Sequence, residues 1–294
     1  MIQTITRTLS AHLLPPRPAD GHKGSFGHVF VISGSRGFTG AMRLCCEAAG
    51  RSGCGLVTAG VPHSLGDIAA TSLIEAMSRL LPDTPQHTIS AAAVEPALAF
   101  AEDKEACVLG PGISTHPETR SFTHEFVARC KPPLVLDADA LNNLAGDTSP
   151  LKSRAPLSAI ITPHPGEMAR LLGTDVGTVQ ADRNAAALDF AAAHGCVVAL
   201  KGHHTVVAHP DGSVALNTSG NSGMATGGTG DVLAGLLGGL LAQGMGAWDA
   251  ARLGVWLHGY AGDCAAEQFT GRALLARDVV AGIPQAFGVL VAGG

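Results

Sequence analysis

The sequence predicts an α/β fold in which a mostly parallel central sheet is covered by helices on both faces. Short, continuous apolar segments rich in β-branched residues alternate with helical patterns along almost the whole chain, as in strands that are buried on both faces. The glycines cluster at the ends of these apolar segments, where tight turns are needed. No linker-like stretch and no internal repeat divides the 294 residues. Because alternating β and α units build parallel sheets, we expect a single domain over residues 1–294.

The predicted elements follow one another in a regular order after an irregular lead-in over residues 1–20. Short apolar runs predict strands over His28–Ser33, Gly55–Gly60, Ala106–Gly110, Pro133–Asp137, Ala159–Thr162 and Cys196–Lys201. Helical spacing predicts helices over Thr39–Arg51, Pro117–Cys130, Gly166–Leu172, Thr178–His194, Thr229–Gln243, Trp248–Phe269 and Ala276–Phe287. The helix over 178–194 has the clearest pattern, since its alanine-rich interior ends at Gly195. After the last of these strands, Pro210-Asp211-Gly212 supplies the turn of a β-hairpin.

The charge balance argues against nucleic acid as a partner. The formal net charge is -5 with histidine neutral, and no run of Lys or Arg exceeds two residues. Binding to a nucleic-acid backbone requires a basic face, which this composition does not offer. A small anionic ligand remains compatible with the sequence, because backbone amides at the start of a helix can hold it without net positive charge.

The apolar content is typical of a globular chain rather than of a membrane protein. The longest apolar run, Val232–Ala242, has eleven residues, far fewer than a membrane span needs. The N-terminal segment has no apolar stretch long enough for a secretory signal. The seven cysteines are odd in number and form no C-x-x-C pair. We therefore expect reduced core cysteines in a cytoplasmic protein rather than disulfides or a zinc site.

Polar and glycine-rich clusters follow five of the predicted strands. They are Ser33-Gly34-Ser35, Gly110-Pro111-Gly112, Asp137-Ala138-Asp139, Thr162-Pro163-His164-Pro165-Gly166-Glu167 and Lys201-Gly202-His203-His204-Thr205. In open α/β sheets, ligands bind outside the carboxyl ends of the strands. Any one cluster is weak evidence, because loops are polar by default. Five clusters at the same edge predict an elongated ligand-binding cleft.

The turn Gly227-Gly228-Thr229-Gly230-Asp231 carries the most specific chemistry. It opens the glycine-rich helix predicted from Thr229, so its backbone amides can converge on an oxyanion at the positive end of the helix dipole. An aspartate at this place can act as a general base that deprotonates a hydroxyl attacking a phosphoryl group. In the alternative interpretation, Thr229 or Asp231 simply caps the helix.

Other common motifs are absent from the sequence. It contains no G-x-x-x-x-G-K-[ST] phosphate loop and no G-x-G-x-x-G after the first predicted strand. It also contains no G-x-S-x-G nucleophile elbow. These absences argue against a P-loop enzyme, a dinucleotide-binding Rossmann domain and an α/β-hydrolase.

The histidines leave alternatives open. His164 lies between two prolines, and a substrate contact and a structural role fit it equally. A metal pair of His164 and Glu167 has no visible third ligand, which argues against zinc. His203 and His204 would point to opposite sides of an extended chain, so at most one should face the cleft. His258 and Asp263, five residues apart on a predicted helix, do not share a face, and we interpret them as structural.

The ordered set of motifs resembles the ribokinase-like superfamily and, within it, the ADP-dependent NAD(P)H-hydrate dehydratases. The resemblance runs from about Lys23 to Pro284 and rests on KGSFGHVFVISGS, GFTGAMRL, GCGLVTAG, LGPGIS, PLVLDADALN, TPHPGEMARLLG, LKGHHTVVA, TSGNSGMATGGTGDVLAG and LHGYAGDCAA. It implies a three-layer sandwich. The GGTGD turn is common to the superfamily, whereas TPHPGE and KGHHT favour the dehydratase branch.

The resemblance also implies a reaction. These enzymes act on the S epimer of hydrated NADH or NADPH, phosphorylate the ring hydroxyl from ADP, and then eliminate phosphate to restore the cofactor. Asp231 matches the proposed base, and the amides around Gly228 and Gly230 would stabilise the transferring phosphoryl group. Magnesium would assist by bridging phosphate oxygens, without a site built from side chains.

Individual positions match the contacts of that family. The residues that match contacts to the hydrate are Ala41, Gly112, His164 and Asp231. The residues that match contacts to the nucleotide are Lys201, Gly202, His203, His204, Thr205 and Gly230. The resemblance further implies a homotetramer. Because larger relatives carry an epimerase domain before the KGSFG motif, we expect an NAD(P)H-hydrate epimerase to be a separate partner protein.

Two other functions remain open at this level. A small-molecule kinase of the same fold, such as one acting on hydroxyethylthiazole, would share the GGTGD turn and keep the phosphate on its product. A nucleotide-sensing module would bind without turnover. The sequence decides neither between ADP and ATP as donor nor between the NADH and NADPH hydrates.

Overall fold

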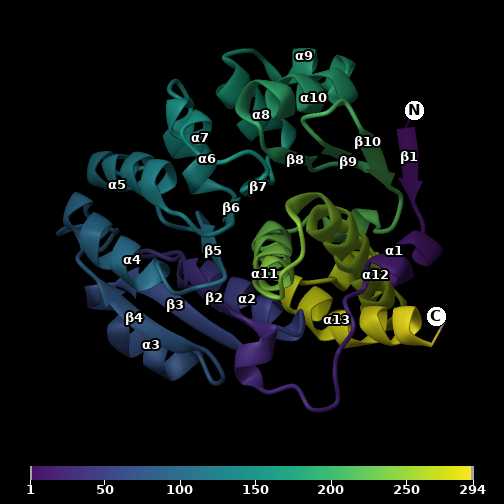
Figure 1. Ribbon diagram of the computed structural model, residues 1–294, viewed down its shortest axis with the longest axis horizontal. Coiled ribbons are helices and arrows are strands. Elements are labelled where there is room, and N and C mark those ends of the chain that lie inside the picture. The colour runs from purple at the N-terminus through teal and green to yellow at the C-terminus, as the bar shows by residue number, and fades with distance from the viewer. Residues whose placement is uncertain (1, 293–294) are drawn as a thin grey trace.

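The fold is organised around one large sheet, seen in Figure 1 as a curved layer between two groups of helices. The computed structural model describes residues 2–292. Within this range ten strands lie in the order β1-β10-β9-β8-β7-β6-β5-β2-β3-β4. Their bounds are β1 Ile2–Ile5, β2 His28–Ile32, β3 Leu56–Pro62, β4 Met77–Leu81, β5 Ala106–Leu109, β6 Leu134–Leu136, β7 Ala159–Ile161, β8 Val197–Leu200, β9 Thr205–Ala208 and β10 Val214–Asn217. The seven strands from β8 to β4 are mutually parallel, and β9 is antiparallel to both of its neighbours.

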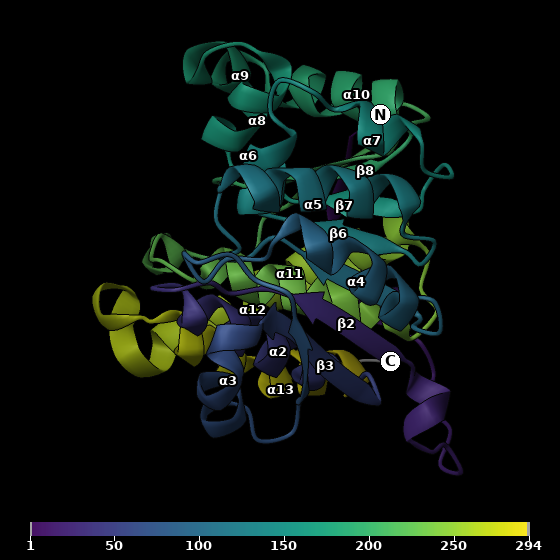
Figure 2. The ribbon, with the colours of Figure 1, turned by 90° about the vertical axis from the view of Figure 1, so that its left-hand side faces the viewer.

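Helices cover both faces of the sheet (Figures 1 and 2). Their bounds are α1 Arg7–Leu13, α2 Thr39–Arg51, α3 Gly66–Ser72, α4 Val94–Ala101, α5 Pro117–Arg129, α6 Asp139–Leu144, α7 Ser149–Lys152, α8 Pro165–Leu172, α9 Val176–Ala181, α10 Arg183–His194, α11 Thr229–Ala242, α12 Ala247–Ala273 and α13 Ala276–Val291. On one face, α2, α11, α12 and α13 share an apolar core. On the other, α4 to α8 and α10 share a second core. This is the three-layer arrangement with a mostly parallel central sheet that the sequence predicts.

The strands hold the two cores apart through their alternating side chains. Along β2, Val29 and Val31 point into the core with α11, whereas Phe30 and Ile32 point into the core with α4 and α5. All four side chains are fully buried. A strand that is apolar at every position is therefore explained by burial on both faces.

The helix that starts at the GGTGD turn lies unusually close to its neighbour. A Cβ atom on Gly235 of α11 would lie 2.0 Å from the carbonyl oxygen of Cys45 in α2, and one on Gly239 would lie 2.7 Å from that of Ala49. Glycine is needed there because any side chain would collide with backbone. This close packing fixes α11 against α2.

The prediction for residues 1–20 is wrong in part. Residues Ile2–Ile5 form β1, which pairs in parallel with β10 at one edge of the sheet, and Arg7–Leu13 form α1, capped by the Thr6 side chain. The sequence signal is weak because only Ile5 of the strand is buried. The long-range bond from Arg7 to the carbonyl oxygen of Val289, 2.6 Å, also depends on the folded chain.

The single helix predicted over residues 178–194 is also wrong. Asp182, with φ of -147°, ends α9 and caps α10, since its side chain accepts a hydrogen bond from the amide of Ala185. Two helices therefore replace one. The other predicted helices and the six predicted strands are present with small shifts of their ends, and the predicted hairpin is formed by β9 and β10.

Two further observations concern the cysteines and the apolar helices. All seven cysteines are buried and free, in agreement with reduced core cysteines. Among residues 2–292, no helix has both the length and the apolar composition that a membrane crossing requires.

Candidate active site

The five polar clusters come together at one edge of the sheet. They follow β2, β5, β6, β7 and β8, and these strands are adjacent and parallel, so their carboxyl ends lie side by side. Hydrogen bonds join the clusters directly: the Gly34 amide donates to the carbonyl oxygen of Pro111 at 2.9 Å, and the Thr162 hydroxyl donates to Asp137 at 2.7 Å. The predicted gathering of these loops is therefore confirmed.

The GGTGD turn lies at the start of α11 with its amides free of a capping side chain. Gly228 occupies the capping position with φ of +96°, a conformation that favours glycine. The Thr229 hydroxyl donates to the carbonyl oxygens of Met224 and Thr226, at 2.9 and 3.1 Å, and thus fastens the turn to the preceding loop. The first-turn amides of α11 remain available for an anion.

Asp231 has the electrostatic character of a base. Burial raises the pKa of its carboxyl group, the charge of Asp137 raises it further, and Lys201 only partly opposes this, so that the pKa reaches about 7. Smaller contributions from Asp139 and Glu167 act in the same upward direction. A carboxylate that titrates near neutral pH can accept a proton more readily than an ordinary aspartate.

A buried ion cluster lies beside the turn. The Lys201 ammonium donates to Asp137 Oδ1 at 2.5 Å and lies 3.8 Å from Glu167 Oε2. The Asp137 and Glu167 carboxylates are 1% and 6% exposed. Burial lowers the pKa of Lys201, but the two carboxylates outweigh it and the pKa is raised. The ammonium is thus firmly charged. Sequence reasoning placed Asp137, Thr162 and Glu167 in the edge clusters but assigned them no role.

Two of the predicted hydrate contacts are direct neighbours. Gly112 follows β5 with φ of +66°, and a Cβ atom built on it would lie 3.1 Å from Cβ of Ala41 at the start of α2. The same atom would lie 2.8 Å from Cβ of Phe38, whose side chain is exposed. Glycine at position 112 therefore allows this loop to pack closely against the start of α2.

His164 has a structural role in the described chain. Its Nδ1 accepts hydrogen bonds from the amides of Gly166 and Glu167, at 2.9 and 3.3 Å, and caps α8. Glu167 completes a capping box by accepting from the His164 amide at 2.8 Å. Burial, followed by the charge of Lys201, lowers the pKa of the imidazole. The ring is half exposed, so a substrate contact is compatible with the cap and stays a prediction.

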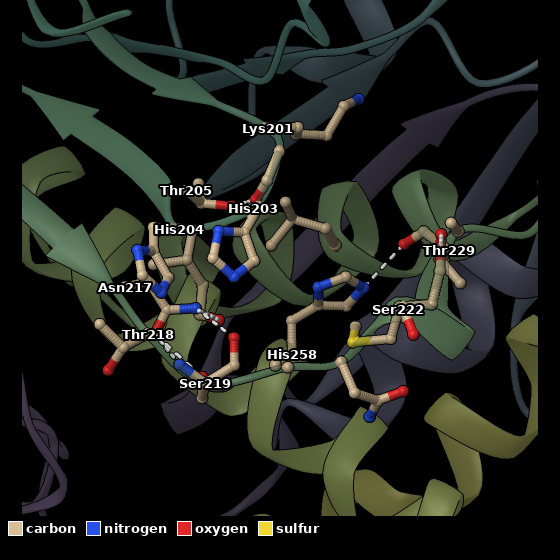
Figure 3. A pocket seen from close by; sticks show the side chains of 18 of the residues that line it. Lys201, His203, His204, Thr205, Asn217, Thr218, Ser219, Ser222, Thr229 and His258 are labelled. Atoms are coloured by element: carbon tan, nitrogen blue, oxygen red, sulfur yellow. Dashed lines mark hydrogen bonds between the residues drawn. The ribbon is translucent and has the colours of Figure 1, made fainter. Parts of the chain in front are cut away.

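A cavity of about 570 Å³ lies beside the turn. It is lined by Lys201 to Thr205, by the loop from Asn217 to Ala225, by Thr229 and Gly230, and by His258 (Figure 3). All of the predicted nucleotide contacts line this cavity: Lys201, Gly202, His203, His204, Thr205 and Gly230.

The expectation that at most one of His203 and His204 faces the cleft is wrong. Both line the cavity, and their rings stack with centroids 4.0 Å apart. The chain is not extended there, because His204 has φ of +58°. The side chain of Arg183 holds this turn by donating to the carbonyl oxygen of His203 at 2.6 Å.

His258 and Asp263 support the walls of the cavity, in agreement with their structural interpretation. Burial lowers the pKa of His258 to about 4, so the neutral ring donates from Nε2 to the carbonyl oxygen of Thr229 at 2.8 Å. Asp263 accepts from the Gly220 amide and from the Asn221 side chain, both at 2.9 Å. His258 fastens the GGTGD turn, and Asp263 fastens the loop that contains Gly220 and Asn221.

The model of a protein family described as NAD(P)H-hydrate dehydratase matches residues 29–285. The chain belongs to this family. A bifunctional NAD(P)H-hydrate repair enzyme from Moorella thermoacetica is 46% identical over 272 residues, which are 92% of this chain and 51% of the relative. An ADP-dependent (S)-NAD(P)H-hydrate dehydratase from Neisseria meningitidis is 41% identical over 221 residues, which are 74% of this chain and 70% of the relative. This chain thus spans about half the length of the bifunctional relative.

Solved structures agree with this family. The ADP/ATP-dependent NAD(P)H-hydrate dehydratase from Bacillus subtilis, co-crystallised with ATP and Mg²⁺, superimposes with a TM-score of 0.84 at 30% identity and covers 98% of this chain and 99% of its own. A ribokinase-like protein from Enterococcus faecalis also reaches 0.84, at 26% identity, covering 98% and 96% of the two chains. A hydroxyethylthiazole kinase from Pyrococcus horikoshii reaches only 0.60 at 14% identity and shares the fold alone.

Proposed function

We propose that this chain is an ADP-dependent lyase that dehydrates the S epimer of NADH or NADPH hydrate and thereby repairs damaged nicotinamide cofactors. The observation that carries the proposal is the position of Asp231, a carboxyl group with a pKa of about 7 at the first turn of α11. It lies next to Gly230, which lines the cavity with the predicted nucleotide contacts. Membership of the dehydratase family supports the same reaction.

The reaction follows from a base placed beside an anion site. Asp231 takes the proton of the ring hydroxyl as its oxygen attacks the terminal phosphorus of ADP. The amides at Gly228 and Gly230 stabilise the charge on the transferring group, and AMP leaves. The lone pair of the ring nitrogen then expels phosphate, and loss of a proton from the adjacent ring carbon restores the dihydronicotinamide. Elimination needs little from the protein because phosphate is a good leaving group.

The two substrates would occupy opposite sides of the GGTGD turn. ADP would lie in the cavity, against the Lys201–Thr205 segment and Gly230. The hydrated ring would lie toward Ala41, Gly112 and His164 at the sheet edge. The relative from Neisseria is named for ADP and the protein from Bacillus for both ADP and ATP, and we propose ADP as the donor here.

Magnesium fits this site as part of the nucleotide complex. Among residues 2–292 there is no group of three or more His, Cys, Asp or Glu side chains that could hold a metal ion. Two carboxylates near the turn already have partners, as Asp137 has with Lys201 and Glu167 with the His164 amide. Mg²⁺ retains waters and is commonly held through phosphate oxygens. When bound, it neutralises phosphate charge, and we propose that ADP carries it in.

The remaining proposals concern partners and place. An NAD(P)H-hydrate epimerase would supply the S epimer, as the bifunctional repair enzyme from Moorella combines two activities. We further propose a homotetramer and a cytoplasmic location. Size-exclusion chromatography with light scattering tests the first of these.

The decisive experiment mixes the full chain with chemically prepared NADH hydrate, ADP and Mg²⁺. The proposal expects the absorbance band of the dihydronicotinamide to return while AMP and free phosphate appear in equal amounts. A stable phosphorylated hydrate, with no return of absorbance, would establish a kinase instead. ADP binding without any consumption would establish a nucleotide-binding module.

A further inference from the structure

The side chain of Lys201 does not follow the rest of its segment into the nucleotide cavity. In Figure 3 it extends away from His203 and His204, although the residue lines the same cavity. Its ammonium group lies 2.5 Å from Asp137 Oδ1 at the end of β6. Lys201 therefore lines the cavity, whereas its ammonium group lies beside Asp137 at the end of β6.

The ammonium group lies next to the catalytic turn. A Cβ atom built on Gly230 would lie 3.3 Å from Lys201 Nζ and 3.5 Å from Asp137 Oδ2. The charge of Lys201 also acts on the neighbouring Asp231 and lowers its pKa. The cation therefore lies beside Gly230, which lines the cavity, and close enough to Asp231 for its charge to act on the carboxyl group.

We propose that the Lys201 ammonium is a catalytic group that contacts the transferring phosphoryl group, and that Asp137, Thr162 and Glu167 are positioning residues that hold it there. This rests on the proposed phosphoryl transfer. An ammonium group has three donors. Asp137 takes one, and Glu167 at 3.8 Å is beyond hydrogen-bond reach, so donors remain for phosphate oxygens.

The positioning residues make the ammonium a fixed charge. The Thr162 hydroxyl donates to the same oxygen of Asp137 at 2.7 Å, and the Lys201 amide donates to the carbonyl oxygen of Pro163 at 2.8 Å. Lysine is flexible when exposed, and anchoring reduces the reorganisation needed when charge develops. The side chain is only 21% exposed, which strengthens its interaction with an anion.

Lys201 takes no proton in the reaction. The bond between the bridging oxygen of ADP and its terminal phosphorus breaks, and AMP leaves with that electron pair. The hydroxyl oxygen of the hydrate forms the new bond to phosphorus, and its proton goes to Asp231. The ammonium offsets negative charge on the phosphoryl oxygens throughout, so its removal should act on the transfer and on terminal-phosphate binding, and spare the AMP portion.

The test compares AMP with ADP as ligands of the full chain by isothermal titration calorimetry. In Lys201→Gln we expect ADP affinity to fall by about tenfold or more, while AMP affinity changes by less than about threefold. The value of kcat should fall by about 100-fold or more. The matched control is Lys152→Gln, an exposed lysine at the end of α7, which should change none of these quantities.

A second variant guards against misfolding, because Lys201→Gln leaves the buried carboxylate of Asp137 unpaired. The double variant Asp137→Asn, Lys201→Gln removes both charges and should show the same loss of preference for ADP. Equal losses of AMP and ADP affinity would assign Lys201 to the AMP portion and overturn the proposal. Unchanged ADP affinity and kcat would overturn it as well. The binding comparison needs no hydrate, so it stands even if dehydration is not observed.

The pH profile separates a positioning role from a merely structural one. The charged groups that act on Asp231 are Asp137, Lys201, Asp139 and Glu167. Asp137→Asn removes a charge that raises the pKa of Asp231, so the acidic limb of the pH profile of kcat should move to lower pH. Lys201→Gln removes a charge that lowers this pKa, so the limb should move to higher pH. A structural defect would lower the rate in both variants without opposite shifts, and that result would remove Asp137 from the mechanism.

Discussion

Replacing Asp231 with Asn should make the protein more stable and nearly inactive. The carboxyl group has a pKa of about 7, compared with an ordinary value of 3.8, because it is buried and lies near other carboxylates. The folded chain therefore binds more protons than the unfolded chain between about pH 4 and pH 7. Stability falls across this window as pH rises, and the destabilisation is complete above pH 7 and absent below pH 4.

The magnitude follows from that difference in pKa. About three pH units at about 1.4 kcal/mol each give an upper limit of about 4 kcal/mol. The amide of Asn must also be desolvated, and Lys201 loses an attractive charge, so we expect a gain of about 1–3 kcal/mol at pH 8. For a chain of this size that gain corresponds to a rise in Tm of about 2–5 °C. At pH 4 the two proteins should have the same Tm.

The activity of Asp231→Asn should change in the opposite direction. Loss of a positioned base lowers kcat by about 10²–10⁴-fold. In the parent protein, the rate should fall about tenfold per pH unit below pH 7, as the base is protonated, and the variant should lack this limb. Asp189→Asn, on the exposed face of α10, is the matched control for both measurements. A Tm gain that is equal at pH 4 and pH 8 would refute the raised pKa, and an unchanged kcat would refute the base.

Three further substitutions test other parts of the site. Gly230→Ala places a Cβ atom 3.3 Å from Lys201 Nζ, so kcat/KM for ADP should fall by about 10–100-fold. The Tm should stay within about 2 °C of the parent's or rise, because alanine favours a helix. An unchanged rate would show that the turn can accommodate the added methyl group. His258→Phe removes the hydrogen bond to Thr229 and should lower the free energy of unfolding by about 1–3 kcal/mol. It should also raise the Kd for ADP, measured by calorimetry. Tighter ADP binding would contradict the role of His258 in holding the turn. Asp182→Ala removes the cap of α10 and should lower the free energy of unfolding, measured by chemical denaturation, by about 1 kcal/mol, with kcat unchanged. A stability equal to the parent's would mean that the break between α9 and α10 needs no cap.

Much of the fold could be predicted because burial leaves a clear pattern. Continuous apolar runs such as Val29–Ile32 occur where a strand is covered on both faces. The strand β4 was missed for the converse reason, since it lies at the sheet edge and four of its five residues are exposed. The strand β1 was missed because its partner β10 lies more than 200 residues along the chain, and local patterns carry no information about such pairing.

The site divides in the same way. The GGTGD turn and the edge clusters could be predicted, because each lies within one short segment of the chain. The partnership of Lys201 with Asp137 could not, because it joins the ends of two strands 64 residues apart. The shared orientation of His203 and His204 depends on a left-handed backbone at His204, which a rule based on extended chains excludes. Motifs within one segment could be predicted from the sequence, whereas contacts between distant loops are shown only by the structure.

The charges around the turn set the pKa of Asp231. The charge of Lys201 acts on Asp137, Glu167 and Asp231, but burial and the charge of Asp137 outweigh it at Asp231, which holds its proton up to about pH 7. In the proposed reaction, a nucleotide brings further negative charge to the same place, which raises the proton affinity of Asp231. The base therefore accepts the hydroxyl proton most readily when the phosphoryl group is in position. Lys201 limits this effect, since without it the pKa of Asp231 would rise further and the base would be deprotonated only at higher pH.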